Sequence, residues 1–197
     1  IVRRVPIGTV GVISPWNFPL ILAMRSVAPA LAMGNAVILK PDTNSAVSGG
    51  LLIAQLFDDA GLPSNVLHVL PGGQEIGRAL VEDPNIGMIS FTGSSVVGRE
   101  VGAVCGRLLK KVALELGGNN AFIVLDDADL DAAASNGAWG AFLHQGQICM
   151  QAGRHIVHRS VAEAYIEKLT ERAANLSVGN PFTNPVHLGP LINKKQH

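Results

Sequence analysis

Two residues, Cys149 and Glu115, have side chains that could carry out covalent catalysis followed by hydrolysis. Cys149 lies in the polar, glycine-rich segment His144–Arg154, a setting that favours a partly exposed and reactive thiolate. Glu115 lies near the end of the apolar run Lys111–Leu116, where we expect its carboxylate to be partly desolvated, as a useful general base is. A thiolate nucleophile and a carboxylate base can together form and then hydrolyse a covalent intermediate.

Each of these residues also has a simpler interpretation. A lone cysteine is more often buried and inert, and a glutamate at the end of a strand can simply meet water or a lysine. Cys105 illustrates the first case, because it is adjacent to Val104 on the apolar face of a helix. We therefore expect Cys105 to be structural.

Asn17 is the third candidate, in the run Pro15-Trp16-Asn17-Phe18-Pro19. Two prolines and two aromatic residues restrict it, and its side-chain amide is a good donor to a developing oxyanion. Alternatively, Asn17 caps the helix that follows, since asparagine is a favoured N-cap residue.

Lys40 and the run Thr92-Gly93-Ser94 follow predicted strands, at the edge where open α/β sheets bind ligands. Lys40 could reach a ribose or a phosphate, or it could be an ordinary solvated lysine. Thr92-Gly93-Ser94 precedes a helix, so its backbone amides and hydroxyl could bind a phosphate. The simpler alternative is a plain turn between strand and helix.

The elements that position these residues follow from hydrophobic periodicity and from proline and glycine. In the first part of the chain a strand is followed by a helix four times, which favours an α/β fold with an open, mostly parallel, Rossmann-like sheet and helices on both faces. The predicted strands are Thr9–Ile13, Ala36–Leu39, Val66–Leu70, Met88–Phe91 and Lys111–Leu116, and the predicted helices are Pro19–Met33, Ser48–Ala60, Glu75–Val81 and Val97–Leu108.

The alternation of strands and helices changes near Leu116–Asn120, where we place a domain boundary. Residues 1–116 form the first domain, and residues 117–197 begin a second α/β domain. Within it we predict strands at Phe122–Leu125 and His155–His158, a helix at Leu130–Leu143, and an amphipathic helix with an apolar face formed by Tyr165, Leu169, Ala173 and Leu176.

The composition excludes several kinds of partner. The net charge is zero and only 15% of residues are charged, so we expect no nucleic acid partner. The longest apolar stretch, Leu20–Met33, is interrupted by Arg25 and Pro29, so we expect no membrane span. The two cysteines form neither a metal-ligand spacing nor a disulfide framework, which favours a metal-free cytoplasmic protein. Because Ile1 is not a start methionine, we expect an excerpt of a longer protein.

In their order and spacing, Asn17, Lys40, Gly93-Ser94, Glu115-Leu-Gly-Gly and Gln145-Gly-Gln-x-Cys149 resemble the aldehyde dehydrogenase superfamily, and the resemblance covers essentially the whole chain. It implies that Cys149 attacks an aldehyde, that Asn17 and the Cys149 N–H hold the oxyanion, and that Glu115 activates the water that hydrolyses the thioester. It also implies that residues 1–116 bind a dinucleotide and that residues 117–197 begin the catalytic domain.

The implied cofactor is NAD or NADP. The resemblance assigns Trp16 and Lys40 to the adenosine side, Gly93 and Ser94 to the pyrophosphate, and Thr92 with Leu116-Gly117 to the nicotinamide side; the further candidates on the same edge are Ile13, Ser14, Pro15 and Thr43. Members that prefer NAD carry a glutamate at the position of Thr43. The threonine makes NADP acceptable without excluding NAD.

The run around Cys149 looks most like the aromatic aldehyde branch, which acts on benzaldehyde and related substrates, and the flanking Ile148 and Met150 suit a flat, apolar aldehyde. The alternatives are a semialdehyde dehydrogenase, including the CoA-acylating type, and a non-catalytic member of the fold; the presence of Glu115 argues against the CoA-acylating type. The family usually forms homodimers or homotetramers. Its glutamate-phenylalanine motif lies beyond His197, so we expect the isolated segment to be inactive.

Overall fold

The computed structural model describes residues 2–197, which fall into two compact units. The first unit ends at Leu116 and the second runs from Gly117 to His197. Each unit has its own hydrophobic core. Among the described residues, no helix is long and apolar enough to cross a membrane.

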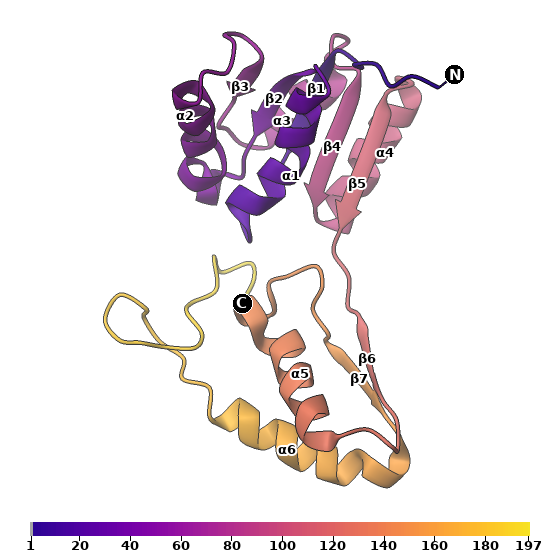
Figure 1. Ribbon diagram of the computed structural model, residues 1–197, viewed down its shortest axis with the longest axis vertical. Coiled ribbons are helices and arrows are strands. Elements are labelled where there is room, and N and C mark those ends of the chain that lie inside the picture. The colour runs from indigo at the N-terminus through magenta and orange to yellow at the C-terminus, as the bar shows by residue number, and fades with distance from the viewer. Residues whose placement is uncertain (1) are drawn as a thin grey trace. The chain divides into compact units, whose positions relative to one another are not determined.

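The first unit is built on a five-stranded parallel sheet with the strand order β3-β2-β1-β4-β5 (Figure 1). From β1 the chain first adds β2 and β3 on one side of the sheet and then β4 and β5 on the other side, which is the doubly wound pattern. The predicted α/β fold class is confirmed. The strands are β1 (Thr9–Ile13), β2 (Ala36–Lys40), β3 (Leu67–Val69), β4 (Met88–Gly93) and β5 (Lys111–Leu116).

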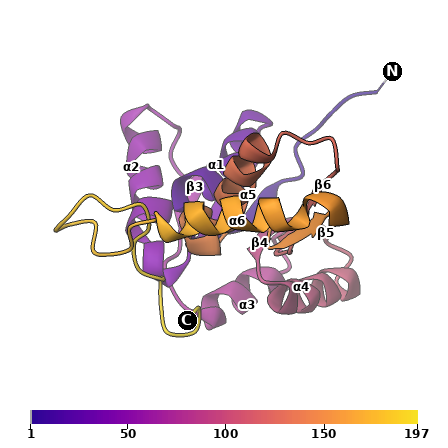
Figure 2. The same cartoon turned by 90° about the horizontal axis from the view of Figure 1, so that it is seen from below.

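Helices cover both faces of this sheet: α1 (Pro19–Ala32), α2 (Leu52–Asp59), α3 (Gln74–Glu82) and α4 (Ser95–Arg107). Figure 2 shows α1 and α2 on one side and α3 and α4 on the other. Two clusters of buried side chains correspond to the two faces. One joins Val27 and Ile53 to β1 and β2, and the other joins Leu80 and Cys105 mainly to β4.

The predicted single helix over Ser48–Ala60 is wrong in its first half. A 3-10 turn, Thr43–Ser45, and a π-helical turn, Val47–Leu51, precede α2. The reason lies in tertiary packing: a Cβ atom at Gly50 would lie 2.6 Å from Cγ of Pro41. The wider π turn brings this glycine against the proline that follows β2, and short π segments of this kind are frequent near functional sites.

The second unit contains a parallel pair of strands, β6 (Ala121–Val124) and β7 (Arg154–Val157), and the helices α5 (Leu130–Phe142) and α6 (Ala162–Ala174). Its core is formed by Val124, Ala134 and Tyr165, and only 1% of Tyr165 is exposed. The predicted strands and helix of this unit are confirmed to within one residue at each end.

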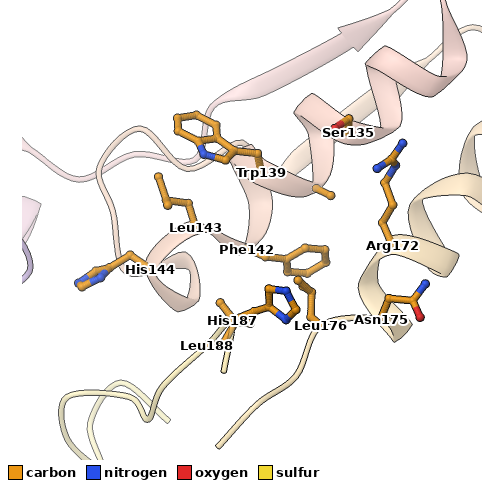
Figure 3. Close-up of a pocket in the computed structure, with 11 residues that line it drawn as sticks. Ser135, Trp139, Phe142, Leu143, His144, Arg172, Asn175, Leu176, His187 and Leu188 are labelled. Carbon is orange, nitrogen blue, oxygen red and sulfur yellow. The ribbon is translucent and has the colours of Figure 1, made fainter. Parts of the chain in front are cut away.

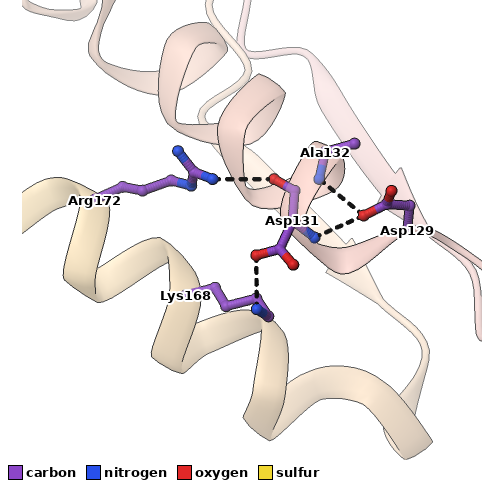
Figure 4. Close-up of polar contacts among 5 residues, drawn as sticks. All are labelled: Asp129, Asp131, Ala132, Lys168 and Arg172. Atoms are coloured by element: carbon purple, nitrogen blue, oxygen red, sulfur yellow. Dashed lines mark hydrogen bonds and ion pairs between the residues drawn. The ribbon is translucent and has the colours of Figure 1, made fainter.

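Charged side chains tie the start of α5 to α6 (Figure 4). The carboxylate of Asp129 accepts hydrogen bonds from the N–H groups of Asp131 and Ala132, which caps α5. The Lys168 ammonium lies 2.7 Å from a carboxylate oxygen of Asp131, and Arg172 donates to the Asp131 carbonyl. The hydrogen bond and charge of Lys168 lower the pKa of Asp131, and Asp131 in turn raises the pKa of Lys168.

Candidate active site

The register of the parallel sheet brings the candidate cofactor residues of the first unit to one edge. Ile13, the last residue of β1, pairs with Lys40 on one side and with Phe91 on the other. Two residues further on, Gly93 pairs with Leu116. The carboxyl ends of parallel strands on either side of such a switch in strand order form the usual ligand crevice of open α/β sheets. This edge carries Ile13, Ser14, Pro15, Trp16, Lys40, Thr92, Gly93, Ser94 and Leu116, and Gly117 begins the next unit.

Lys40 is buried, with 9% of its surface exposed, so the interpretation as an ordinary solvated lysine is wrong for this structure. It also acts on Glu75 at the start of α3. The pKa of Glu75 is lowered chiefly by hydrogen bonds from its own N–H and that of Gly73, and to a smaller extent by the charge of Lys40. A buried ammonium at the end of a strand suits an anionic or hydroxyl-bearing ligand.

Two buried hydroxyls near this edge have no hydrogen-bond partner among the described residues. They are Oγ of Ser14, directly after β1, and Oγ of Ser45, in the turn after β2. Buried polar atoms are rarely left without a partner, so both fit a bound polar ligand such as a dinucleotide. Ser45 was not among the sequence candidates, because nothing in its local sequence indicates that its hydroxyl is buried. Thr43, in the same turn, is exposed.

Ser94 caps α4, since its Oγ accepts a hydrogen bond from the N–H of Val97. The Ser94 hydroxyl therefore caps a helix, a role that the phosphate-binding interpretation did not include. The first N–H groups of α4 have no acceptor within the helix by geometry, so they remain suited to a phosphate. A Cβ atom at Gly93 would lie 2.6 Å from the ring of Phe91, which explains why glycine stands at the end of β4.

Asn17 is half-buried in the loop between β1 and α1. The N-cap residue of α1 is Phe18, and no side chain caps this helix end. The alternative role of Asn17 as the cap of α1 is therefore wrong. The proline at the first position of α1, Pro19, supplies the helix start instead.

Glu115 does not have the desolvated environment that the sequence suggested. Its side chain is 62% exposed, and one carboxylate oxygen lies 3.2 Å from a guanidinium nitrogen of Arg25 on α1. The apolar neighbours do not cover it because side chains alternate along a strand. Leu114 and Leu116 contact α4 on one face, and Glu115 points to the other. In addition, β5 is the last strand of the sheet.

Arg25 was not among the sequence candidates for the site. In the sequence, Arg25 is apparent only as an interruption of the apolar stretch Leu20–Met33. Its contact with Glu115 joins residues that lie far apart in the chain, so no local pattern reveals it.

Cys149 is exposed and Cys105 is buried, as the sequence predicts. The Gln151 N–H donates to the Ile148 carbonyl at 3.2 Å, which places Cys149 second in a four-residue turn. Asn120 holds this turn from the side: its side-chain amide donates to the Cys149 carbonyl at 3.2 Å, and its backbone N–H donates to the Gln151 carbonyl at 3.0 Å.

The backbone just before Cys149 is left-handed at three consecutive residues. His144, Gln145 and Gly146 have φ values of 53°, 59° and 72°. Positive φ is uncommon for residues other than glycine, and strained backbone of this kind occurs preferentially at functional sites. The segment that leads to the thiol therefore has a defined and costly conformation.

The second unit also contains a cavity of about 410 Å³ between α5, α6 and the segment that follows α6 (Figure 3). Trp139 and Phe142 supply aromatic surface, and Arg172 and His187 supply polar groups. None of the residues predicted to form the active site lines this cavity.

The sequence matches the aldehyde dehydrogenase family over residues 1–197, so the chain belongs to this family. The resemblance carried by Asn17, Glu115 and Cys149 is thereby confirmed at the level of the family. Over 194 residues the chain is 69% identical to the benzaldehyde dehydrogenase [NAD(+)] of Pseudomonas putida and 61% identical to the vanillin dehydrogenase of Amycolatopsis sp.. Both alignments cover 98% of this chain and 40% of the relative.

Solved structures agree with this assignment. The NAD-dependent benzaldehyde dehydrogenase from Corynebacterium glutamicum superposes with a TM-score of 0.91 and 51% identity, over 98% of this chain and 42% of that one. The aldehyde dehydrogenase of Mycobacterium tuberculosis complexed with NAD+ gives 0.93 and 42%, over 97% and 39%. The chain thus spans about 40% of the length of the curated relatives that it matches.

Proposed function

We propose that this chain supplies the cofactor-binding edge and the nucleophile of an NAD(P)-dependent aldehyde dehydrogenase of the relatives' length. The observation that carries the proposal is the exposed Cys149 in a turn held by Asn120, within a chain of this family. In this proposal the unit ending at Leu116 binds the dinucleotide, and the unit beginning at Gly117 is the first part of the catalytic domain.

Cys149 acts first in the proposed reaction. Its thiolate adds to the aldehyde carbon, and the Asn17 side-chain amide and the Cys149 N–H donate to the oxyanion that forms. Collapse of this adduct with loss of a hydride leaves a thioester on Cys149. Glu115 then takes a proton from water, the water oxygen attacks the thioester carbon, and Cys149 leaves as a thiolate while the carboxylic acid is released.

For Glu115 to act in this way, its carboxylate must leave the ion pair with Arg25 or share it with the water. The Glu115 side chain is 62% exposed, so solvent can reach it. Surface ion pairs of this kind contribute only about 0–1 kcal/mol to stability, so opening this pair costs little.

The proposed cofactor site is the edge of the sheet formed by the ends of β1, β2, β4 and β5. A nicotinamide dinucleotide bound there would supply the acceptor for the hydride that the adduct loses. The start of α4 would hold phosphate, and Lys40 and the Ser14 hydroxyl would hold polar groups of the dinucleotide. Two relatives are named as NAD-dependent, whereas an Escherichia coli structure with 40% identity is named as NADP-dependent. With Thr43 in place of a glutamate, both dinucleotides fit the proposal.

We propose aromatic aldehydes as the substrate class. Relatives named as benzaldehyde and vanillin dehydrogenases support it, and the apolar side chains of Ile148 and Met150 flank the nucleophile. The test compares kcat/KM for benzaldehyde with that for short aliphatic aldehydes. A markedly lower value for benzaldehyde would remove the aromatic assignment and leave the dehydrogenase mechanism intact.

The mechanism is tested in the full-length polypeptide that carries this sequence, by following NADH or NADPH formation with Cys149→Ala, Glu115→Gln and the control Cys105→Ala. We expect no product with Cys149→Ala, a burst of about one equivalent followed by slow turnover with Glu115→Gln, and unchanged chemistry with Cys105→Ala. Undiminished turnover by Cys149→Ala would refute the proposed function.

A further inference from the structure

Hydrogen bonds hold several of the peptide groups around Cys149. The carbonyl of Ile148 accepts from the Gln151 N–H, which orients the peptide group that carries the Cys149 N–H. Asn120 binds the next carbonyl, that of Cys149, as well as the carbonyl of Gln151. The direction of the Cys149 N–H is thus set by the turn as a whole rather than by the cysteine itself.

A second set of bonds continues from this turn into the core. The Ala152 N–H donates to the Gly140 carbonyl at 2.9 Å, and the Ala152 carbonyl accepts a bond of 3.0 Å from Nε2 of His155. A carbonyl can only accept, so Nε2 of His155 carries a proton. In the tautomer that carries its proton on Nε2, Nδ1 accepts the 2.7 Å hydrogen bond from the Tyr165 hydroxyl.

The position of Tyr165 distinguishes this chain of bonds from surface contacts. Tyr165 is 1% exposed on α6, and the ring of His155 packs against both the Tyr165 ring and the Phe122 ring. Gly137 on α5 faces the tyrosine hydroxyl, and a Cβ atom there would overlap with it. The core therefore has room for this hydroxyl, although a phenylalanine would fill the remaining apolar volume equally well.

We propose that His155 and Tyr165 are positioning residues for Cys149: they fix the Ala152 carbonyl and thereby the orientation of the nucleophile and of its oxyanion-binding N–H. The inference rests on the proposed function, because it assumes that Cys149 is the nucleophile. Neither residue contacts the aldehyde. Their effect is on the geometry of the attack, where a displacement of about 1 Å can lower a rate by about a hundredfold.

The test uses the full-length polypeptide that carries this sequence and compares Tyr165→Phe with the control Leu169→Ala. Leu169 packs against the same core cluster and its side chain makes no hydrogen bonds, so its truncation lowers stability without touching the bonds. We expect Tyr165→Phe to slow the pre-steady-state burst by about tenfold with unchanged cofactor affinity. Leu169→Ala should lower the melting temperature at least as much and leave the burst rate within about twofold of wild type.

The double variant Tyr165→Phe/His155→Phe adds a check on the pathway. If the tyrosine acts through the histidine, the double variant is no slower than His155→Phe alone, since coupled residues are not additive. A multiplicative effect of the two changes would contradict the proposed chain of bonds.

Two results would overturn the inference: a wild-type burst in Tyr165→Phe, or equal slowing by Tyr165→Phe and Leu169→Ala, which would indicate loss of stability alone. The proposed function is tested separately by Cys149→Ala. If that variant is inactive and Tyr165→Phe behaves as wild type, only the positioning role fails.

Discussion

The two cysteines of this chain differ in exposure, and this difference is measurable without any substrate. Cys149 is exposed in its turn, whereas Cys105 is fully buried on α4 and burial raises the pKa of its thiol. Burial keeps reagents away from the Cys105 thiol, and the raised pKa disfavours its reactive thiolate form.

We therefore expect one thiol of the native chain to react rapidly with iodoacetamide and the second to react only after unfolding in urea. Mass spectrometry of the labelled peptides checks the assignment, and Cys149→Ala should remove the rapid phase. Rapid modification of Cys105 in the folded chain would contradict the burial described above.

At the scale of single residues, the local sequence explains the environment of some site residues but not of others. The polar, glycine-containing surroundings of Cys149 indicate an exposed loop, and the structure agrees. The surroundings of Glu115 are misleading, because apolar neighbours in a strand point to the opposite face and the strand lies at the edge. Asn120 was missed, since its contact with Cys149 joins residues 29 positions apart. Contacts of this kind depend on the fold and leave no local pattern.

Among the elements, the π-helical turn before α2 depends on close packing of two glycines against prolines. A Cβ atom at Gly49 would lie 2.8 Å from Cβ of Pro19, and one at Gly50 would lie 2.6 Å from Cγ of Pro41. Proline rings cannot rotate away, so the backbone itself would have to move.

We expect Gly50→Ala to lower the free energy of unfolding by about 1–3 kcal/mol. The matched control is Gly106→Ala on α4, where a Cβ atom would meet no atom within 4 Å; it should stabilise by up to about 1 kcal/mol through its helix propensity. Urea denaturation measures both. Equal effects of the two substitutions would show that the packing at Gly50 is unimportant.

The ion pair between α5 and α6 gives a pH dependence with a definite sign. The pKa of Asp131 is lowered by Lys168, so its contribution to stability is present at neutral pH and is lost as pH falls through the lowered pKa. The pKa of Lys168 is raised by Asp131, so its contribution is present below the ordinary lysine pKa and is lost only as pH rises through the raised value.

We expect Asp131→Asn to lower the melting temperature slightly between about pH 4 and about pH 10, with the difference vanishing in acid below this range. The effect is small because Asp131 and Lys168 are 74% and 36% exposed. Asp127→Asn is the control, since Asp127 forms no ion pair within residues 2–197. A difference that persists unchanged at pH 2 would refute the electrostatic explanation.

The elements themselves were largely predictable. β1 and β5 begin and end where the sequence predicts, because each is an apolar run bounded by a turn or by glycine. The helix predicted over Ser48–Ala60 is wrong in its first half, where Gly49 and Gly50 lie in the π-helical turn. Gly49 packs against Pro19 and Gly50 packs against Pro41, and these contacts between distant residues are apparent only in the folded chain.

On the scale of the whole molecule, the division at Leu116 gives each unit a core of its own. The two tryptophans of the chain fall one on each side: Trp16 in the first unit and Trp139 in the second. Each can therefore report the unfolding of a single unit.

We expect the variants Trp16→Phe and Trp139→Phe to give fluorescence transitions at different urea concentrations, with the larger unit more resistant because it buries more apolar surface. Circular dichroism of the unsubstituted chain should show both steps. Superimposable transitions from the two variants would instead mean that the units unfold cooperatively.

The edge position of β5 has a consequence for handling the protein as well as for its chemistry. An edge strand can pair with another polypeptide, and exposed charged side chains are a common means of preventing such association. Lys111 and Glu115 are exposed charged residues near the two ends of this strand. We therefore expect Glu115 to limit association at this edge besides being the candidate base, since neutralising it leaves Lys111 as the only remaining charge on β5.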